Sequence, residues 1–184
     1  MNNIGFVVVL TLVSSTIYQT SAQTAARFKI YEDPIYGIKI LYASSWEKKT
    51  LNPLSYENPT TSFLVNFSSS KNLISSGNQS ATVVIHVENV SNELDEYNYL
   101  EIRHLEETSP SFSLTGANTT VLAGKPAYQV QYTESLAQGI FGTYQIWTID
   151  NGKVYRISYT AKVSEFPTYM SMVQKMIRSF DIVK

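Results

Sequence analysis

The chain contains no cysteine, so its fold and its chemistry must do without thiols. Disulfides, thiolate metal sites, cysteine nucleophiles and lipid-modified cysteines are all excluded. The fold therefore depends on its hydrophobic core alone. Glycine-rich phosphate loops and the Gly-x-Ser-x-Gly pattern of serine hydrolases are absent from the sequence as well.

Histidine is scarce, with two residues in the whole sequence, His86 and His104. His86 falls in a β-branched stretch that predicts a buried strand over 82–87, and His104 lies near the end of a predicted helix. Neither has a second histidine four residues away or a flanking carboxylate cluster, so no metal-ligand spacing is present. We expect one sheet histidine and one exposed helix histidine. A metal or acid–base pair formed in space is the alternative.

The sequence also lacks an excess of either charge, because 14 Lys and Arg residues nearly balance 15 Asp and Glu residues, for a net charge of −1. Such a surface exerts no long-range attraction on nucleic acid or an anionic membrane. The first predicted helix is acidic, and a solvated helix face explains this. A calcium-attracting or partner-facing surface is the alternative, although no Asp-x-Asp-x-Asp-Gly loop is present.

Long apolar runs are limited to one, from Ile4 to Val13. A Ser/Thr-rich stretch follows and ends at Ala22, which together predicts a secretory signal peptide over 1–22, cleaved after Ala22. Residues 23–184 are then expected to form a single domain. No Lys or Arg precedes Ile4, which leaves an uncleaved anchor as the alternative, but a spanning helix needs about 20 apolar residues. We expect an exported, extracytoplasmic protein, either secreted or on the outer face of the cell membrane.

Four Asn-x-Ser/Thr acceptor sequences suit that location. They are candidate glycosylation sites, at Asn66, Asn78, Asn89 and Asn118.

Alternating apolar and polar residues predict strands over most of the chain, including short strands over 112–114 and 119–122, and Gly124-Lys125-Pro126 predicts a turn after them. Helices are expected after Asn92 and Ser164. Each has an apolar face at helical spacing, formed in the first by Leu94, Tyr97, Ile102 and Leu105, and in the second by Phe166, Tyr169 or Met170, Val173, Met176 or Ile177, and Phe180. The Asn151-Gly152 pair predicts a tight hairpin between strands over 141–149 and 153–161. The many tyrosines and both tryptophans are expected to build the core and the sheet faces, and a ligand groove is the alternative. The pattern indicates an α+β fold, with a mainly antiparallel sheet and two covering helices.

Three stretches together resemble the PsbP family, which includes extrinsic lumenal proteins of photosystem II. They are Tyr31-Glu-Asp-Pro-Ile-Tyr-Gly-Ile-Lys-Ile-Leu-Tyr-Ala-Ser-Ser-Trp46, Leu122-Ala-Gly-Lys-Pro-Ala-Tyr-Gln-Val-Gln-Tyr132, and Asn151-Gly-Lys-Val-Tyr-Arg-Ile-Ser-Tyr159 followed by a helix that ends Met176-Ile-Arg-Ser-Phe-Asp181. The resemblance implies a central antiparallel sheet sandwiched between helices, a PsbP-like α/β/α sandwich.

The resemblance also implies a binding or assembly module. We expect an exported, non-enzymatic protein that associates with a membrane complex or an envelope component, through a protein partner, with peripheral membrane association possible and no nucleic acid bound. No catalytic, cofactor-binding or metal-binding residue is assigned. One alternative is a divalent-cation binder, since calcium or manganese follows from the resemblance. The other is an extracytoplasmic hydrolase or ligand-processing enzyme whose site is assembled from distant residues.

Overall fold

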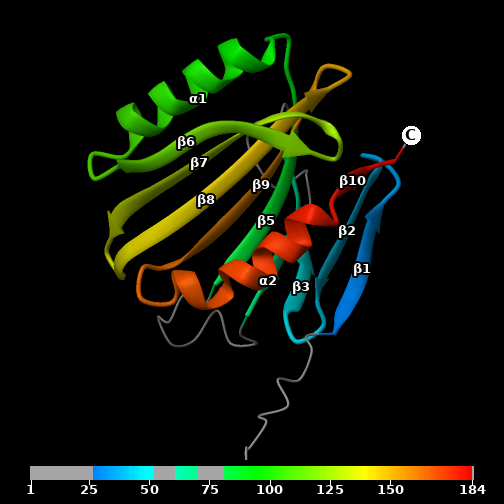
Figure 1. Ribbon diagram of the computed structural model, residues 1–184, viewed down its shortest axis with the longest axis horizontal. Coiled ribbons are helices and arrows are strands. Elements are labelled where there is room, and N and C mark those ends of the chain that lie inside the picture. Colours follow the sequence, from blue (N-terminus) through cyan, green and yellow to red (C-terminus); the bar gives the residue numbers. More distant parts are fainter. Residues whose placement is uncertain (1–26, 52–60, 70–80, 184) are drawn as a thin grey trace, which may run out of the picture.

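The computed structural model describes residues 27–51, 61–69 and 81–183, in which two antiparallel sheets and two helices pack together (Figure 1). The seven strands of the large sheet, in spatial order, are β3 (Glu47–Thr50), β4 (Thr61–Ser68), β5 (Thr82–Asn89), β9 (Lys153–Lys162), β8 (Gly139–Asp150), β7 (Lys125–Leu136) and β6 (Ser113–Leu122). The three strands of the small sheet are β1 (Phe28–Asp33), β2 (Ile38–Ala43) and β10 (Asp181–Ile182). The helices are α1 (Leu94–Thr108) and α2 (Phe166–Arg178).

Two tight hairpins of the large sheet have both turn residues in the left-handed conformation. Between β8 and β9, Asn151 and Gly152 have φ values of 50° and 72°, the left-handed conformation that a type I′ turn requires. This hairpin is confirmed. Between β6 and β7 the same conformation occurs at Ala123 (φ 50°) and Gly124 (φ 72°). The turn therefore lies one residue earlier than the expected Gly124-Lys125-Pro126, and Pro126 enters β7 near its first residue, where a missing N–H is tolerated.

One face of the large sheet is covered by α2 and the small sheet. The predicted apolar stripe of α2 is confirmed, with Val173, Met176 and Ile177 buried. These side chains join aromatic and β-branched residues of both sheets in the larger hydrophobic core. Figure 1 shows α2 lying across the strands beside the small sheet.

The opposite face of the large sheet carries α1 over a smaller core. Side chains alternate along a strand, so Trp147 and Val154 point to this face while their neighbours join the larger core. The buried members of the smaller core are Tyr97, Val130, Tyr132, Trp147 and Val154. The predicted face of α1 is confirmed, because Leu94, Ile102 and Leu105 pack against this core.

The predicted starts of both helices are wrong by one residue. Glu93 occupies the N-cap position of α1 in place of Asn92, and Glu165 occupies that of α2 in place of Ser164. Neither glutamate makes a side-chain capping bond, so both helices depend on packing for their position rather than on the capping chemistry that the sequence predicted. Within the described residues, neither helix is long and apolar enough to cross a membrane.

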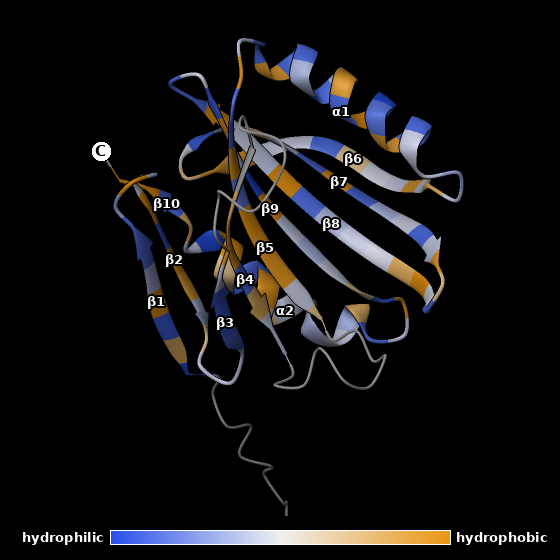
Figure 2. Cartoon of the chain, turned by 180° about the vertical axis from the view of Figure 1, so that it is seen from behind, coloured by the Kyte–Doolittle hydropathy of each residue, from blue (hydrophilic) through white to orange (hydrophobic). Residues whose placement is uncertain are grey.

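The expectation of a mainly antiparallel α+β fold is confirmed, but the sheets dominate and the helices cover less than a sandwich implies. Two strands had no sequence signal: β3 is polar throughout, and β10 has two residues. Two short strands expected over 112–114 and 119–122 are one continuous strand, β6, whose residues are nearly all exposed. Figure 2 shows the small sheet standing at the side of the large one.

Candidate functional site

The most polar constellation of the described residues lies between α1 and the large sheet. Strand register places it there: His86 of β5 and Trp147 of β8 both pair with Arg156 of β9, one on each side. Paired residues of neighbouring strands point to the same face. Three adjacent strands therefore present a histidine, an arginine and an indole to the underside of α1.

Arg156 is the centre of an ion cluster. Its Nη2 lies 3.3 Å from Glu88 Oε1 and also donates to the Tyr97 hydroxyl, while its Nη1 donates to Glu101 Oε1. The Tyr97 hydroxyl in turn donates to Glu88 Oε1. The guanidinium side chain is 11% exposed, and a charge at that depth is stable only when it is paired and hydrogen-bonded.

The same cluster holds α1 on the sheet. Trp147 Nε1 donates to Asn98 Oδ1 at 2.7 Å, and the guanidinium lies over the rings of Tyr97 and Trp147, at 5.7 and 5.8 Å from their centroids. Tyr97, Asn98 and Glu101 lie on one side of α1, at three- and four-residue spacing. The charged groups thus bind one another, and the arrangement is suited to fixing the helix rather than to polarising a substrate.

Burial sets the protonation states of this region. It lowers the pKa of His86 well below its usual value, and the positive charge of Arg156 lowers it further. His86 is therefore neutral near neutral pH, with its ring edge against Phe63 at a centroid distance of 5.2 Å. Burial also raises the pKa of Tyr97, with Arg156 acting in the opposite direction. Tyr97 therefore stays protonated and acts as the donor to Glu88.

The structure separates the two histidines. His86 is buried in the cluster, while His104 lies on the exposed side of α1. No three His, Asp or Glu residues within 27–51, 61–69 and 81–183 come together in a way that could hold a metal ion. A metal or acid–base pair formed in space would need a second group beside His86. His104 is not near it, and the neighbouring carboxylate of Glu88 is bound by Arg156.

The acceptor asparagines have different surroundings. Asn118 is exposed in the middle of β6, where its Oδ1 accepts a hydrogen bond from Gln129 Nε2 at 2.8 Å, and Asn89 is exposed at the end of β5. Asn66 is half-buried in β4, with its Oδ1 out of contact with solvent. Asn78 and the predicted cleavage site after Ala22 lie outside the described residues. Glycosylation and cleavage stay predictions.

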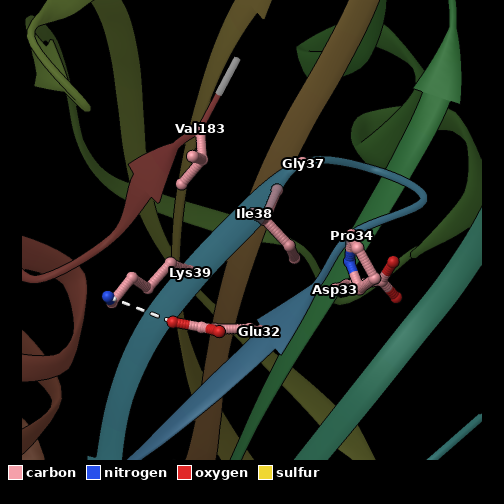
Figure 3. Close-up of a pocket in the computed structure, with 7 residues that line it drawn as sticks. All are labelled: Glu32, Asp33, Pro34, Gly37, Ile38, Lys39 and Val183. Atoms are coloured by element: carbon pink, nitrogen blue, oxygen red, sulfur yellow. Dashed lines mark ion pairs between the residues drawn. The ribbon is translucent and has the colours of Figure 1, made fainter.

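A separate hollow lies on the small sheet, between the β1–β2 turn and the end of β10 (Figure 3). Its volume is about 370 Å³. Its charged side chains are engaged locally: Glu32 forms an ion pair with Lys39 at 3.1 Å, and Asp33 Oδ1 accepts the backbone N–H groups of Ile35 and Tyr36. Asp33 therefore closes the turn, and among the described residues that line the hollow there is no histidine, serine or threonine.

Sequence reasoning missed Arg156 as the centre of the polar cluster. The available signal was an arginine at the middle of the apolar stretch Val154-Tyr-Arg-Ile-Ser-Tyr159, where a charge on a central strand requires a partner. Its partners come from β5 and from α1. No spacing rule connects residues that far apart, so only the fold identifies them.

Three solved structures share this fold. The chain matches cyanobacterial PsbP (CyanoP) from Synechocystis sp. PCC 6803 with a TM-score of 0.62 and 13% identity, over 95% of this chain and 98% of that one. LpqN, involved in cell envelope biogenesis of Mycobacterium tuberculosis, matches with a TM-score of 0.60 and 14% identity, over 87% and 92%. The Saccharomyces cerevisiae Ran-binding protein Mog1p matches with a TM-score of 0.54 and 14% identity, over 87% and 97%.

The comparison with curated proteins gave no sequence match. The comparison with protein families did: the family described as PsbP-like protein matches residues 9–182, almost the whole chain. This agrees with the three sequence stretches and with the fold shared with cyanobacterial PsbP. The chain belongs to the PsbP-like protein family.

Proposed function

We propose that this protein is an exported, non-enzymatic PsbP-like module that binds a protein component of a membrane complex or of the cell envelope. Family membership over residues 9–182 carries the proposal. Two structural neighbours, a Ran-binding protein and a protein involved in cell envelope biogenesis, agree with a binding or assembly role. Because fold similarity alone does not transfer function, the contacts of the polar residues must support it.

Those contacts favour binding over catalysis. The strongest polar cluster is closed beneath α1, where Arg156 is shared by Glu88 and Glu101 and where His86 is buried and neutral. A general base must reach the proton that it abstracts, and these groups are turned into the core. The outer surfaces are then the parts of the molecule that meet a partner.

Recovery of a partner from membranes tests the function. The immobilised protein is incubated with solubilised membranes of the source cells, and bound proteins are identified by mass spectrometry. A matched control is the Arg156→Ala variant, in which the interior is damaged and the surface sequence is unchanged. We expect one component to be enriched reproducibly on the native protein. Failure to enrich any component would overturn the binding function, and turnover of a substrate would overturn the non-enzymatic assignment.

Export and processing are parts of the proposal, and cation binding is an alternative to it; separate measurements decide each of them. Amino-terminal sequencing of the released protein is expected to begin at Gln23, and a start at Met1 in a membrane fraction would favour an anchor. Intact-mass measurement detects glycans at the four acceptor asparagines. Calorimetric titration with calcium and manganese decides the cation-binding alternative, for which heats equal to those of buffer are expected.

A further inference from the structure

The large sheet has two edges of different character. One edge is β3, which has four residues, three of them charged: Glu47, Lys48 and Lys49. The other edge is β6, which has ten residues and contains neither a charge nor a proline. Charges and short length protect an edge strand from pairing, whereas a long uncharged edge is a template for another strand. In the described part of the chain, no strand pairs with the outer side of β6.

The hairpin between β6 and β7 determines which backbone groups of β6 are free. In a two-residue hairpin the flanking residues, Leu122 and Lys125, form a hydrogen-bonded pair, and such pairs alternate along an antiparallel ladder. Thr120 and Asn118 therefore bond to β7. Ala117, Thr119 and Val121 turn their N–H and C=O groups outward, and all three residues are exposed.

The helix beside this edge is acidic. Figures 1 and 2 both show α1 running alongside β6, and α1 continues into β6 through residues 109–112. The exposed basic groups of α1 are Arg103, which is paired with Glu107, and His104. The exposed carboxylates of α1 are those of Asp95, Glu96, Glu106 and Glu107. A strand added to β6 would therefore lie in a negative field.

We propose that the outer edge of β6 binds an extended segment of a partner protein by strand addition, and that this segment carries lysine or arginine on the side facing α1. The inference rests on the proposed binding function and names the surface and the partner chemistry. Main-chain hydrogen bonds to Ala117, Thr119 and Val121 supply the affinity, and the alternate side chains supply the specificity. A second copy of the chain is disfavoured as the occupant, because pairing two β6 strands would bring two acidic helices together.

One substitution tests the outward-facing backbone groups of β6 without disturbing its pairing with β7. Proline at position 117 removes an N–H that points to solvent, and proline is tolerated at such edge positions. Ala117→Pro also leaves the acceptor sequence Asn118-Thr119-Thr120 intact. The matched control is Ala117→Thr, which keeps the N–H and adds a side chain that suits a strand. Thermal unfolding of both variants checks that β6 and β7 remain paired.

The probe is a synthetic ten-residue peptide that alternates valine or threonine with lysine, and its control has glutamate in place of lysine. Amide exchange and chemical-shift changes are followed in the isotope-labelled protein. We expect the lysine peptide to protect the amides of Ala117, Thr119 and Val121 and to lose affinity as salt is raised. Ala117→Pro is expected to weaken binding by about tenfold or more, and Ala117→Thr to leave it unchanged. The glutamate peptide is expected not to bind.

Four results would overturn the inference: equal binding to Ala117→Pro, protection of a region other than β6, self-association through β6 in place of peptide binding, or absence of lysine-peptide binding. Membrane recovery separates this failure from failure of the proposed function. If the native protein and Ala117→Pro retain the same partner equally, the β6 edge is not the binding surface, but the binding function stands. If the native protein retains none, the binding function itself is wrong.

Discussion

The two faces of the large sheet are built from different chemistry. The face under α2 and the small sheet is filled almost wholly by apolar side chains, including the fully buried Ile157, Tyr159 and Met176. The face under α1 holds five buried hydrophobic residues and the Arg156 cluster. Within the described residues, the buried side-chain atoms without a hydrogen-bond partner are Asn66 Oδ1, Gln145 Oε1 and Arg156 Nε.

Strand alternation places all three of these atoms on the α1 side of the sheet. Unpaired buried polar atoms weaken the face that contains them. We therefore expect most of the free energy of folding to come from the α2 face. Detaching α1 from the sheet is expected to cost less free energy than detaching α2. Four predictions test this division.

The largest effect is expected from Arg156→Ala. This change removes the cation that the partly buried carboxylates of Glu88 and Glu101 share, and loss of one partner from a buried ion pair costs about 3–5 kcal/mol of unfolding free energy. Denaturant unfolding measures it. The control replaces the whole cluster, as Arg156→Met with Glu88→Gln and Glu101→Gln, and is expected to recover most of the loss. A triple variant as unstable as Arg156→Ala would show that shape, not charge, dominates under α1.

The next effect compares apolar packing on the two faces. Met176 of α2 is fully buried, whereas Leu105 of α1 is half-buried. We expect Met176→Ala to lower the free energy of unfolding by about 3 kcal/mol and Leu105→Ala by about 1 kcal/mol. Hydrogen exchange adds a second measurement, since α1 amides are expected to exchange faster than α2 amides in the native protein. Equal losses of unfolding free energy in Met176→Ala and Leu105→Ala would show that the two faces contribute equally to stability.

A smaller effect measures how tightly the α2 face is packed. A Cβ at Gly142 would lie 2.9 Å from Cδ2 of Phe166, which begins α2. We expect Gly142→Ala to cost about 1–3 kcal/mol because the ring must shift. Gly116→Ala is the control: no atom lies within 4 Å of its Cβ, and a change within about 0.5 kcal/mol is expected. Thermal melts compare the two variants. An unchanged melting temperature for Gly142→Ala would mean that the α2 face is not tightly packed at this position.

The smallest effect is the pH dependence due to His86, which is faced by Arg156, Glu88 and Phe63. Its folded pKa lies below its unfolded value of about 6.5, so the unfolded chain binds the extra proton. Stability is full above that pH and falls as pH decreases, by at most about 1.4 kcal/mol per pH unit. His86→Gln is expected to reduce this slope between pH 6.5 and 5. An unchanged slope would assign the titration to carboxylates.

The sequence predicted the fold where its signals were local. The Asn151-Gly152 turn, the apolar stripe of α2 and the inward face of α1 follow from turn chemistry and helical spacing, and all three are confirmed. The strand β3 was missed because Glu47-Lys-Lys-Thr50 has no apolar alternation. It exists because it pairs with β4, a tertiary contact that overrides local preference.

The candidate site was less predictable than the fold. His86 was placed correctly in a strand, but its protonation state and surroundings depend on Arg156. Arg156 is 70 residues away in the sequence and adjacent only through strand register. Glu101 reaches the same arginine from a helix. Such a cluster has no signature in a single sequence, because each member alone resembles an ordinary charged residue.

The pairing of β10 with β2 has a consequence for the order of folding. Asp181 and Ile182 pair with Lys39 and Ile38, and the Leu41 backbone N–H donates to Ser179 Oγ across 138 residues of sequence. Contacts of such long sequence separation form slowly, since a large loop must close first. During synthesis, the small sheet remains incomplete until residues near 182 have emerged. The first strands made are therefore among the last to be secured.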